Sequence, residues 1–251
     1  MALKRLCGRI AIVTASTDGI GYAIARRLAQ EGAKVVISSR KNKNVEEAVQ
    51  KLCDENLDVI GTTCHVSKPE DRKKLFEAAN KLGGLDILVS NAGVNTEMCL
   101  VLDTSESSWD KVFDVNVKAS FLLAKESLPL LRKSKSGRII FVSSIGGLHF
   151  DQPFHEVGAY CVSKTTLIGL TKAAALQLAP ENITVNSICP GIIQTKFSAA
   201  ITSQETLKYI PLGRLGQPQD VSATAAFLAS EDAAYITGEN IVVGGGMSSR
   251  L

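Results

Sequence analysis

The sequence of 251 residues predicts an α/β fold: one domain in which helices cover both faces of a doubly wound parallel sheet. Short apolar runs rich in β-branched residues alternate with longer amphipathic stretches, as strands alternating with helices do. Most of these runs are almost continuously apolar, which is typical of strands buried on both faces of a parallel sheet. No linker, low-complexity segment or internal repeat divides residues 1–251, so we expect a single domain with right-handed crossovers.

The elements follow in order along the chain. The expected strands are Ile10–Thr14, Lys34–Ser38, Val59–Cys64, Ile87–Ser90, Ile139–Ser143, Thr184–Ile188 and Asn240–Val243. The expected helices are Gly19–Gln30, Val45–Glu55, Pro69–Lys81, Ser107–Leu131, Ala159–Leu178 and Pro218–Ala229. Two of them start on a proline, which is favoured in a first turn because its missing N–H has no helical partner there.

Composition excludes several classes of protein. The chain is 45% hydrophobic and 21% charged, and its net charge of +3 is spread along the sequence. Without a basic run, a nucleic-acid partner is not expected. No apolar stretch reaches the ~18 residues of a membrane span. The six cysteines are scattered, which favours reduced thiols, and no histidine or cysteine pair has zinc-ligand spacing, so we expect no metal.

The first expected strand leads into a turn of small residues, Thr14–Gly21, directly before a helix. Such a turn lets backbone N–H groups approach a pyrophosphate at the helix N-terminus. The alternative is a tight turn that serves only packing. The candidate cofactor-binding residues here are Thr14, Ser16, Asp18, Gly19, Ile20 and Gly21.

The end of the second strand, about 20 residues later, favours one cofactor over the other. An NAD enzyme would carry Asp or Glu here for the ribose hydroxyl, and that carboxylate would repel the 2′-phosphate of NADP. This chain has Ser39, Arg40 and Lys41 instead. A planar guanidinium suits a phosphate, so we expect NADP(H). The alternative is a solvated basic turn.

Two further strand ends are candidates for the same site. His65 and Val66 close the third strand, where they could border an adenine. Asn91, Ala92 and Gly93 follow the fourth strand. Small residues there would let the chain pass close to the cofactor, and Asn91 can supply an amide.

Tyr160 and Lys164 are four residues apart at the start of an expected helix, so they share one face. The pKa of a free phenol is near ~10, and a nearby ammonium lowers it, which suits an acid–base catalyst. Ser144, at the end of a strand, could donate a hydrogen bond to a carbonyl oxygen. The same spacing also occurs on exposed helices without function.

Together these motifs resemble the short-chain dehydrogenase/reductase family over essentially the full chain. Asn116, Ser143 and the Pro190-Gly191 pair followed by Thr195 add to the resemblance. It implies that Tyr160 protonates a carbonyl oxygen as hydride arrives from the nicotinamide, and that Ser144 orients that oxygen.

The resemblance also assigns supporting roles. Lys164 would hydrogen-bond the nicotinamide ribose while lowering the Tyr160 pKa, and Asn116 would support a proton relay through Lys164. The residues implied to border the nicotinamide are Pro190, Gly191, Ile193 and Thr195.

Within the family the chain is most similar to NADP-dependent reductases. This likeness implies a homo-oligomer, commonly a tetramer, that reduces lipophilic ketones, dicarbonyls or retinal. The alternative enzyme is a 3-oxoacyl or hydroxysteroid dehydrogenase on the same scaffold. A nucleotide-binding protein without turnover is disfavoured, because such a scaffold needs no complete acid–base relay.

The sequence departs from the family pattern in two places. Ala15 replaces a usual glycine; its methyl should be tolerated if φ stays negative, but would loosen pyrophosphate contacts. The stretch Ile145–Ala159 is a few residues longer than is typical, and we expect its Leu148, Phe150 and Phe154 to line the substrate site. Packing against a neighbouring subunit is the alternative for these side chains.

The segment from Thr195 to Tyr209 mixes apolar residues such as Phe197 with small polar ones. We expect a mobile lid over a hydrophobic substrate site, with Phe197 lining it; an ordinary surface helix is the alternative.

The sequence finishes with Ser249-Arg250-Leu251, which differs from the Ser-Lys-Leu peroxisomal signal by one residue. We therefore expect a peroxisomal protein recognised by an import receptor, with a cytoplasmic location or a plain polar tail as the alternative.

Overall fold

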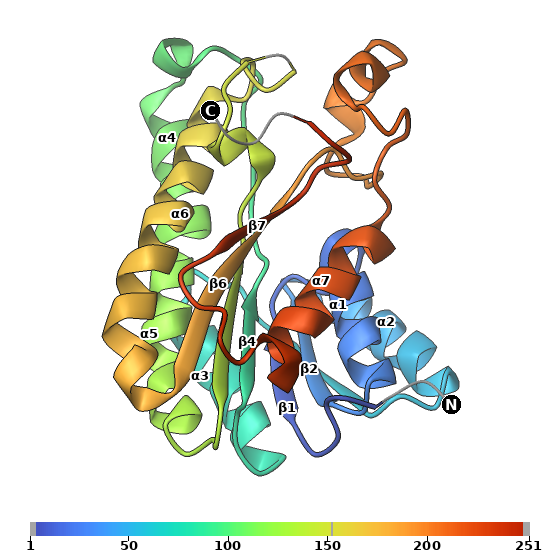
Figure 1. Ribbon diagram of the computed structural model, residues 1–251, viewed down its shortest axis with the longest axis vertical. Coiled ribbons are helices and arrows are strands. Elements are labelled where there is room, and N and C mark those ends of the chain that lie inside the picture. Colours follow the sequence, from blue (N-terminus) through green and yellow to red (C-terminus); the bar gives the residue numbers. More distant parts are fainter. Residues whose placement is uncertain (1–3, 152, 248–251) are drawn as a thin grey trace.

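Seven parallel strands form one sheet in this computed structural model, which describes residues 4–151 and 153–247 (Figure 1). The strand order is β3-β2-β1-β4-β5-β6-β7, and each neighbouring pair is parallel. The strands are β1 Ile10–Val13, β2 Lys34–Ser39, β3 Val59–Thr63, β4 Ile87–Ser90, β5 Gly137–Val142, β6 Ile183–Pro190 and β7 Asn240–Val243. The predicted doubly wound fold is confirmed.

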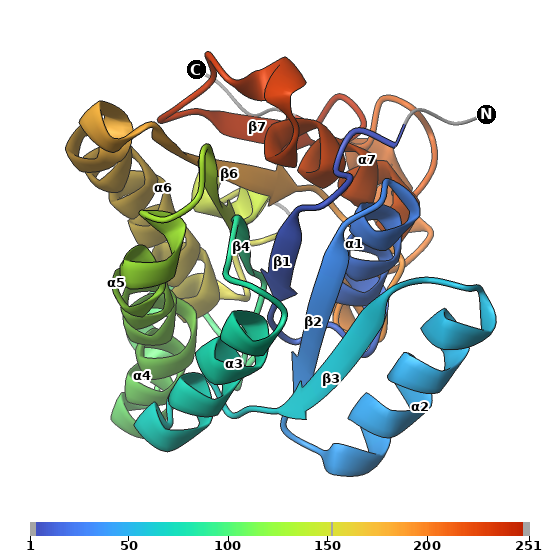
Figure 2. The ribbon, with the colours of Figure 1, turned by 90° about the horizontal axis from the view of Figure 1, so that it is seen from below.

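Helices cover both faces of the sheet (Figure 2). They are α1 Gly19–Gln30, α2 Asn42–Asp54, α3 Pro69–Lys81, α4 Glu106–Phe113, α5 Ala119–Leu131, α6 Gly158–Leu178 and α7 Pro218–Ala229. Helices α1, α2 and α7 enclose one apolar core against the sheet, and α3, α5 and α6 enclose the other. Every residue of β1, β4, β5 and β6 is buried, which explains the apolar runs in these strands. The polar residues within them, among them Arg138, Asn186 and Ser187, are buried as well.

One predicted helix differs from the structure. The expected continuous helix Ser107–Leu131 is divided into α4, a π-helical turn Asp114–Lys118, and α5. A π turn inserts one residue into the helical repeat and changes which way the side chains within it point. The expectation of a single regular helix was wrong at this point.

Among the described residues, no helix is long and apolar enough to cross a membrane, and no group of His, Cys, Asp or Glu could hold a metal ion. Ser249, Arg250 and Leu251 lie outside the described residues.

Candidate active site

A cavity of about 440 Å³ opens at the carboxyl edge of the sheet. Ligands of open α/β sheets bind at this edge, where the strand order reverses, here between β1 and β4. The walls of the cavity come from the segments that follow β1, β4, β5 and β6. A second cavity of about 180 Å³, at the ends of β2 and β3, shares Ala15, Asp18, Arg40 and Gly93 with the first. The two adjoining cavities form the candidate site.

The small-residue turn contributes backbone to both cavities. Gly19 has a φ of +56°, and its N–H donates to Asp18 Oδ1 at 2.8 Å, so Asp18 caps α1. Asp18, Gly19, Ile20 and Gly21 line the larger cavity.

Two other residues of the turn hold its shape. Thr14 Oγ1 accepts N–H bonds from Asn91 (3.0 Å) and Ala92 (3.2 Å), which ties the end of β1 to the end of β4. Ser16 is buried, and its hydroxyl donates to Val13 O at 2.6 Å. Neither Thr14 nor Ser16 lines either cavity, so both residues stabilise the turn from its buried side.

Ala15 does not meet the condition under which its methyl group should be tolerated, a negative φ. Its φ is +50°, in the left-handed region. Asn91 Nδ2 donates to the carbonyl oxygens of Thr14 and Ala15, both at 3.0 Å, and so holds the strained peptide in place. The Ala15 side chain is exposed and borders both cavities.

The smaller cavity gathers most of the residues predicted for the adenosine end of a cofactor. Ser39, Arg40, His65, Val66, Ala92 and Gly93 line it. Arg40 is exposed and, within the described residues, its guanidinium makes no hydrogen bond or ion pair. Burial, helped by the charges of Lys111 and Arg40, lowers the pKa of His65 and favours a neutral imidazole. Lys41 lies outside both linings, at the N-cap of α2.

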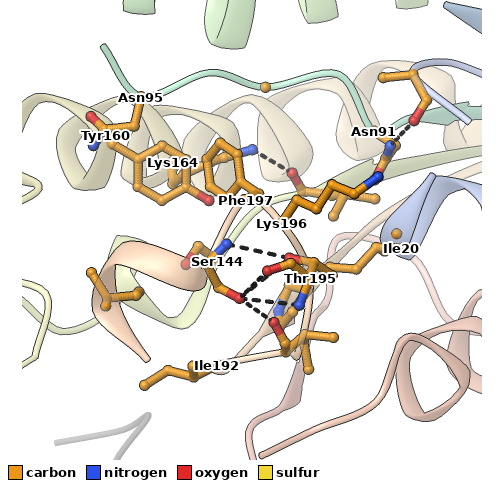
Figure 3. A pocket seen from close by; sticks show the side chains of 18 of the residues that line it. Ile20, Asn91, Asn95, Ser144, Tyr160, Lys164, Ile192, Thr195, Lys196 and Phe197 are labelled. Carbon is orange, nitrogen blue, oxygen red and sulfur yellow. Dashed lines mark hydrogen bonds between the residues drawn. The ribbon is translucent and has the colours of Figure 1, made fainter. Parts of the chain in front are cut away.

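Ser144, Tyr160 and Lys164 converge on the larger cavity (Figure 3). Lys164 Nζ lies 5.4 Å from the centroid of the Tyr160 ring and donates to Val142 O at 2.8 Å. Burial lowers the pKa of Lys164 to about 8. Pro190, Gly191, Ile193 and Thr195, which the resemblance places beside the nicotinamide, line the same cavity.

The electrostatics of Tyr160 differ from the prediction. Burial raises the pKa of its phenol above the usual value, and a hydrogen bond with the Ser144 side chain only partly opposes this rise. The expected lowering of this pKa by Lys164 is therefore wrong for the site as it stands, because desolvation outweighs the neighbouring groups.

Asn116 lies in the π-helical turn, behind the cavity wall. Its Oδ1 accepts from Val94 N at 2.8 Å, and its Nδ2 donates to Val94 O (3.0 Å) and Ser163 Oγ (2.9 Å). Ser163 in turn donates to Tyr160 O at 2.6 Å. A β-carbon at Gly93 would lie 3.2 Å from Lys164 Nζ and 3.5 Å from Asn116 Oδ1, so these two polar groups approach each other across a glycine.

The substrate end is lined by some of the predicted aromatic residues. Phe154 and Phe197 border the larger cavity, and the Phe197 ring lies 5.6 Å from that of Tyr160 (Figure 3). Leu148 and Phe150 lie outside this lining, and Phe150 is 48% exposed. The long stretch between Ser144 and Tyr160 thus contributes Phe154 to the cavity, but not these two neighbours.

Several lining residues carry no motif in the sequence. They are Asn95, Met98, Val157, Ile192, Lys196 and Ile201. Their only sequence signal is position: each lies within a few residues of a predicted site residue. Most are apolar, so the substrate end of the cavity is hydrophobic.

The arrangement fits a nicotinamide dinucleotide. An α1 N-terminus in a small-residue turn suits a pyrophosphate, and the unpaired Arg40 guanidinium suits a further phosphate. Tyr160, Ser144 and Lys164 at the other end supply a proton donor, a hydroxyl and an amine beside a hydrophobic space.

Comparisons with known proteins agree with this geometry. Residues 14–248 match the family model described as enoyl-(acyl carrier protein) reductase. Dehydrogenase/reductase SDR family member 4 of Sus scrofa is 51% identical over 254 residues, covering 99% of this chain and 90% of that protein. Tropinone reductase-like 3 of Erythroxylum coca is 48% identical, covering 99% and 96%. A short-chain type dehydrogenase/reductase from Mycobacterium marinum superposes with a TM-score of 0.92 at 31% identity, covering 99% and 98%.

Proposed function

The chain belongs to the short-chain dehydrogenase/reductase family, and from that premise we propose that it is an NADPH-dependent reductase of lipophilic ketones, dicarbonyls or retinal. Members of this family are oxidoreductases that act on alcohol or carbonyl groups with a nicotinamide cofactor. The observation that carries the finer proposal is the convergence of Tyr160, Ser144 and Lys164 on a cavity whose other walls are mainly apolar.

The protein's own groups perform the acid–base part of the reaction. Bound NADPH would supply the hydride. The Ser144 hydroxyl donates a hydrogen bond to the substrate carbonyl oxygen, and the Tyr160 hydroxyl delivers its proton to that oxygen as negative charge develops. Burial keeps the Tyr160 pKa high, so the phenol stays protonated at neutral pH, which is the form that reduction requires. Lys164, beside the ring, places a positive charge near the reacting oxygen.

Replacement of Tyr160 by phenylalanine tests the mechanism. We expect kcat/KM for aromatic ketones to fall by about 10²- to 10⁴-fold, because general acid catalysis is lost, while NADPH affinity stays nearly the same. The matched control is Tyr209→Phe, at an exposed tyrosine outside both cavities. Retained turnover in Tyr160→Phe would remove this residue from the mechanism. Wild-type protein inactive on ketones, α-dicarbonyls and retinal would overturn the proposed function.

The choice of NADP(H) rests on Arg40. We expect Arg40→Asp to shift the ratio of kcat/KM values toward NADH, because the variant loses a phosphate partner and gains a repelling carboxylate. Lys41→Asp makes the same change of charge one residue away but outside both cavities, so its shift should be much smaller. An unchanged cofactor ratio in Arg40→Asp, or an equal shift in both variants, would show that Arg40 does not contact the phosphate.

A second candidate is the reduction of acyl thioesters, which the description of the matching family model favours. The two activities are separated by measuring acyl thioesters and free ketones side by side with NADPH. A higher kcat/KM on thioesters would favour this second candidate, and a hydroxysteroid panel tests the related dehydrogenase reading.

We also propose that the protein is a homotetramer and that its Ser249-Arg250-Leu251 end directs it to peroxisomes. Exposed apolar side chains on α5 and α6, Phe121 and Leu176, support assembly with further copies. Light scattering of the purified protein tests the tetramer. The location of a fluorescent fusion with and without residues 249–251 tests the import signal.

A further inference from the structure

Lys196 ties the segment over the cavity to the turn before α1. It follows Thr195 at the start of the segment 195–209, which we call the lid segment. Lys196 Nζ lies 2.7 Å from Asp18 Oδ2, while Asp18 Oδ1 accepts the Gly19 N–H. Both side chains of the pair are exposed, at 91% and 65%, and both residues line the larger cavity.

This ion pair is a weak element of stability. Exposed pairs of this kind contribute little to stability, because water screens them and both side chains lose freedom when they pair. Lys196 can therefore exchange Asp18 for another anion without loss of the fold.

The charged side chains around the two cavities show where such an anion could bind. Among the described residues, the charged side chains that line the cavities are Asp18, Arg40, Lys164 and Lys196. Lys164 is buried and donates to Val142 O, and Arg40 lies at the end of β2. Of these four lining residues, Lys196 and Asp18 are the cation and the carboxylate at the α1 N-terminus.

A carboxylate bound to an α1 N–H and to a lysine occupies the place that suits a phosphate group. We propose that Lys196 is a phosphate ligand of the dinucleotide, exchanging its Asp18 partner for a cofactor phosphate when the cofactor binds. This inference rests on the proposed function, since it needs a phosphorylated cofactor in these cavities.

The residues on either side of Lys196 connect the proposed exchange to the position of the lid segment. A β-carbon at Gly19 would lie 3.3 Å from Thr195 Cγ2, so the lid segment rests directly on the turn. Phe197, on the other side of Lys196, packs against Tyr160 (Figure 3). A phosphate held by Lys196 would thus keep the lid segment against both the cofactor turn and the catalytic tyrosine.

Two variants with opposite expected effects test the proposal. Lys196→Ala should raise the Kd of NADPH about tenfold and speed its release, because a charge-assisted hydrogen bond is lost. Asp18→Asn, which keeps an oxygen to cap Gly19, should lower the Kd by removing the competing anion. Binding and release are followed by the fluorescence of the reduced nicotinamide, in equilibrium titration and stopped flow. If the ion pair only held the lid segment in place, both variants would change the Kd of NADPH in the same direction, and the proposal would be overturned.

The control variant is Lys208→Ala, which removes a lysine of the same lid segment that pairs with Glu205 outside both cavities. Its NADPH Kd should match that of the wild type; an increase equal to that of Lys196→Ala would reduce the effect to overall charge and overturn the proposal.

Repeating the titrations with NADH identifies the phosphate. An equal loss for both cofactors in Lys196→Ala assigns the contact to the pyrophosphate, and a loss confined to NADPH assigns it to the 2′-phosphate. Wild-type protein that binds neither cofactor would overturn the proposed function as well. Normal wild-type binding with an unaffected Lys196→Ala would overturn the role of Lys196 alone.

Discussion

Ala15 shows how one residue can be held against its own preference. A left-handed conformation costs a residue with a β-carbon about 1–2 kcal/mol, yet Ala15 adopts it, with the amide of Asn91 donating to its carbonyl oxygen. The strain lies at the junction of the two cavities.

Replacement of Ala15 by glycine should release this strain. We expect the free energy of unfolding to rise by up to ~1 kcal/mol, because glycine adopts positive φ freely but loses more entropy on folding. Tm should increase by about 2–4 °C per kcal/mol in a chain of this size. Thermal denaturation checks this, with Gly19→Ala, at a φ of +56°, as the opposite change. A lower Tm in Ala15→Gly would show that the strain is not relieved.

The candidate catalytic residues were predictable only as a set, because the spacing of Tyr160 and Lys164 also occurs on exposed helices without function, and the combination with Ser144 and Asn116 carried the family resemblance. The same approach did not separate Phe154, which lines the cavity, from Phe150, which does not. Both are aromatic residues of one loop, and the direction of a loop side chain depends on tertiary packing. Lys196 was missed because the ion pair on which its proposed role rests is with Asp18, far away in the sequence.

At the scale of elements, the π-helical turn between α4 and α5 places Asn116 where it can reach α6. A regular helix would match the apolar spacing of residues 107–131 equally well, which is why the sequence alone predicts one. The difference links two elements of the candidate site, since Asn116 donates a hydrogen bond to Ser163, one residue before Lys164.

Ser163→Ala tests this link between elements. The buried Asn116 amide loses an acceptor, so we expect the free energy of unfolding to fall by ~1 kcal/mol. We also expect kcat to fall several-fold with little change in the KM for NADPH, because Asn116 is no longer fixed to the helix that carries Tyr160. Thr166→Ala is the matched control, since its hydroxyl bonds only Val162 O on an exposed part of α6. Equal kcat values in both variants would contradict the link.

At the scale of the whole molecule, the doubly wound parallel sheet and its two helical layers could be predicted, because alternating strands and helices leave few topologies. The ion pairs that join distant parts of the chain could not, because charged residues pair in ways that no local pattern shows. Arg5 is one such residue: it contacts Glu31 after α1 at 2.7 Å and Asp232 after α7 at 3.0 Å. It thereby connects the first helix of the cofactor site to the last helix of the fold.

This connection predicts how stability depends on pH. Burial alone would raise the pKa of Glu31, but hydrogen bonds from Arg5 and Arg27 outweigh it and leave that pKa below its usual value. A carboxyl group with a lower pKa in the folded state binds fewer protons than in the unfolded chain, so its contribution is present above the unfolded pKa and is lost as pH falls through the folded one. We expect Tm to drop below about pH 4.5, near the usual carboxyl pKa.

The free energy of unfolding of Glu31→Gln at pH 7 should be lower by ~2 kcal/mol. The neutral amide removes the charge from three hydrogen bonds, two from Arg5 and one from Arg27. The Tm of this variant should then fall less steeply than that of the wild type as the pH drops from 5 to 3. Glu205→Gln, at an exposed pair, should follow the wild-type curve. Thermal scans across this pH range check all three proteins. If the Tm of Glu31→Gln fell as steeply as that of the wild type between pH 5 and 3, other carboxyl groups would cause the acid sensitivity. Glu231 would be one of them, because a hydrogen bond from Ser136 and the charge of Arg138 also lower its pKa.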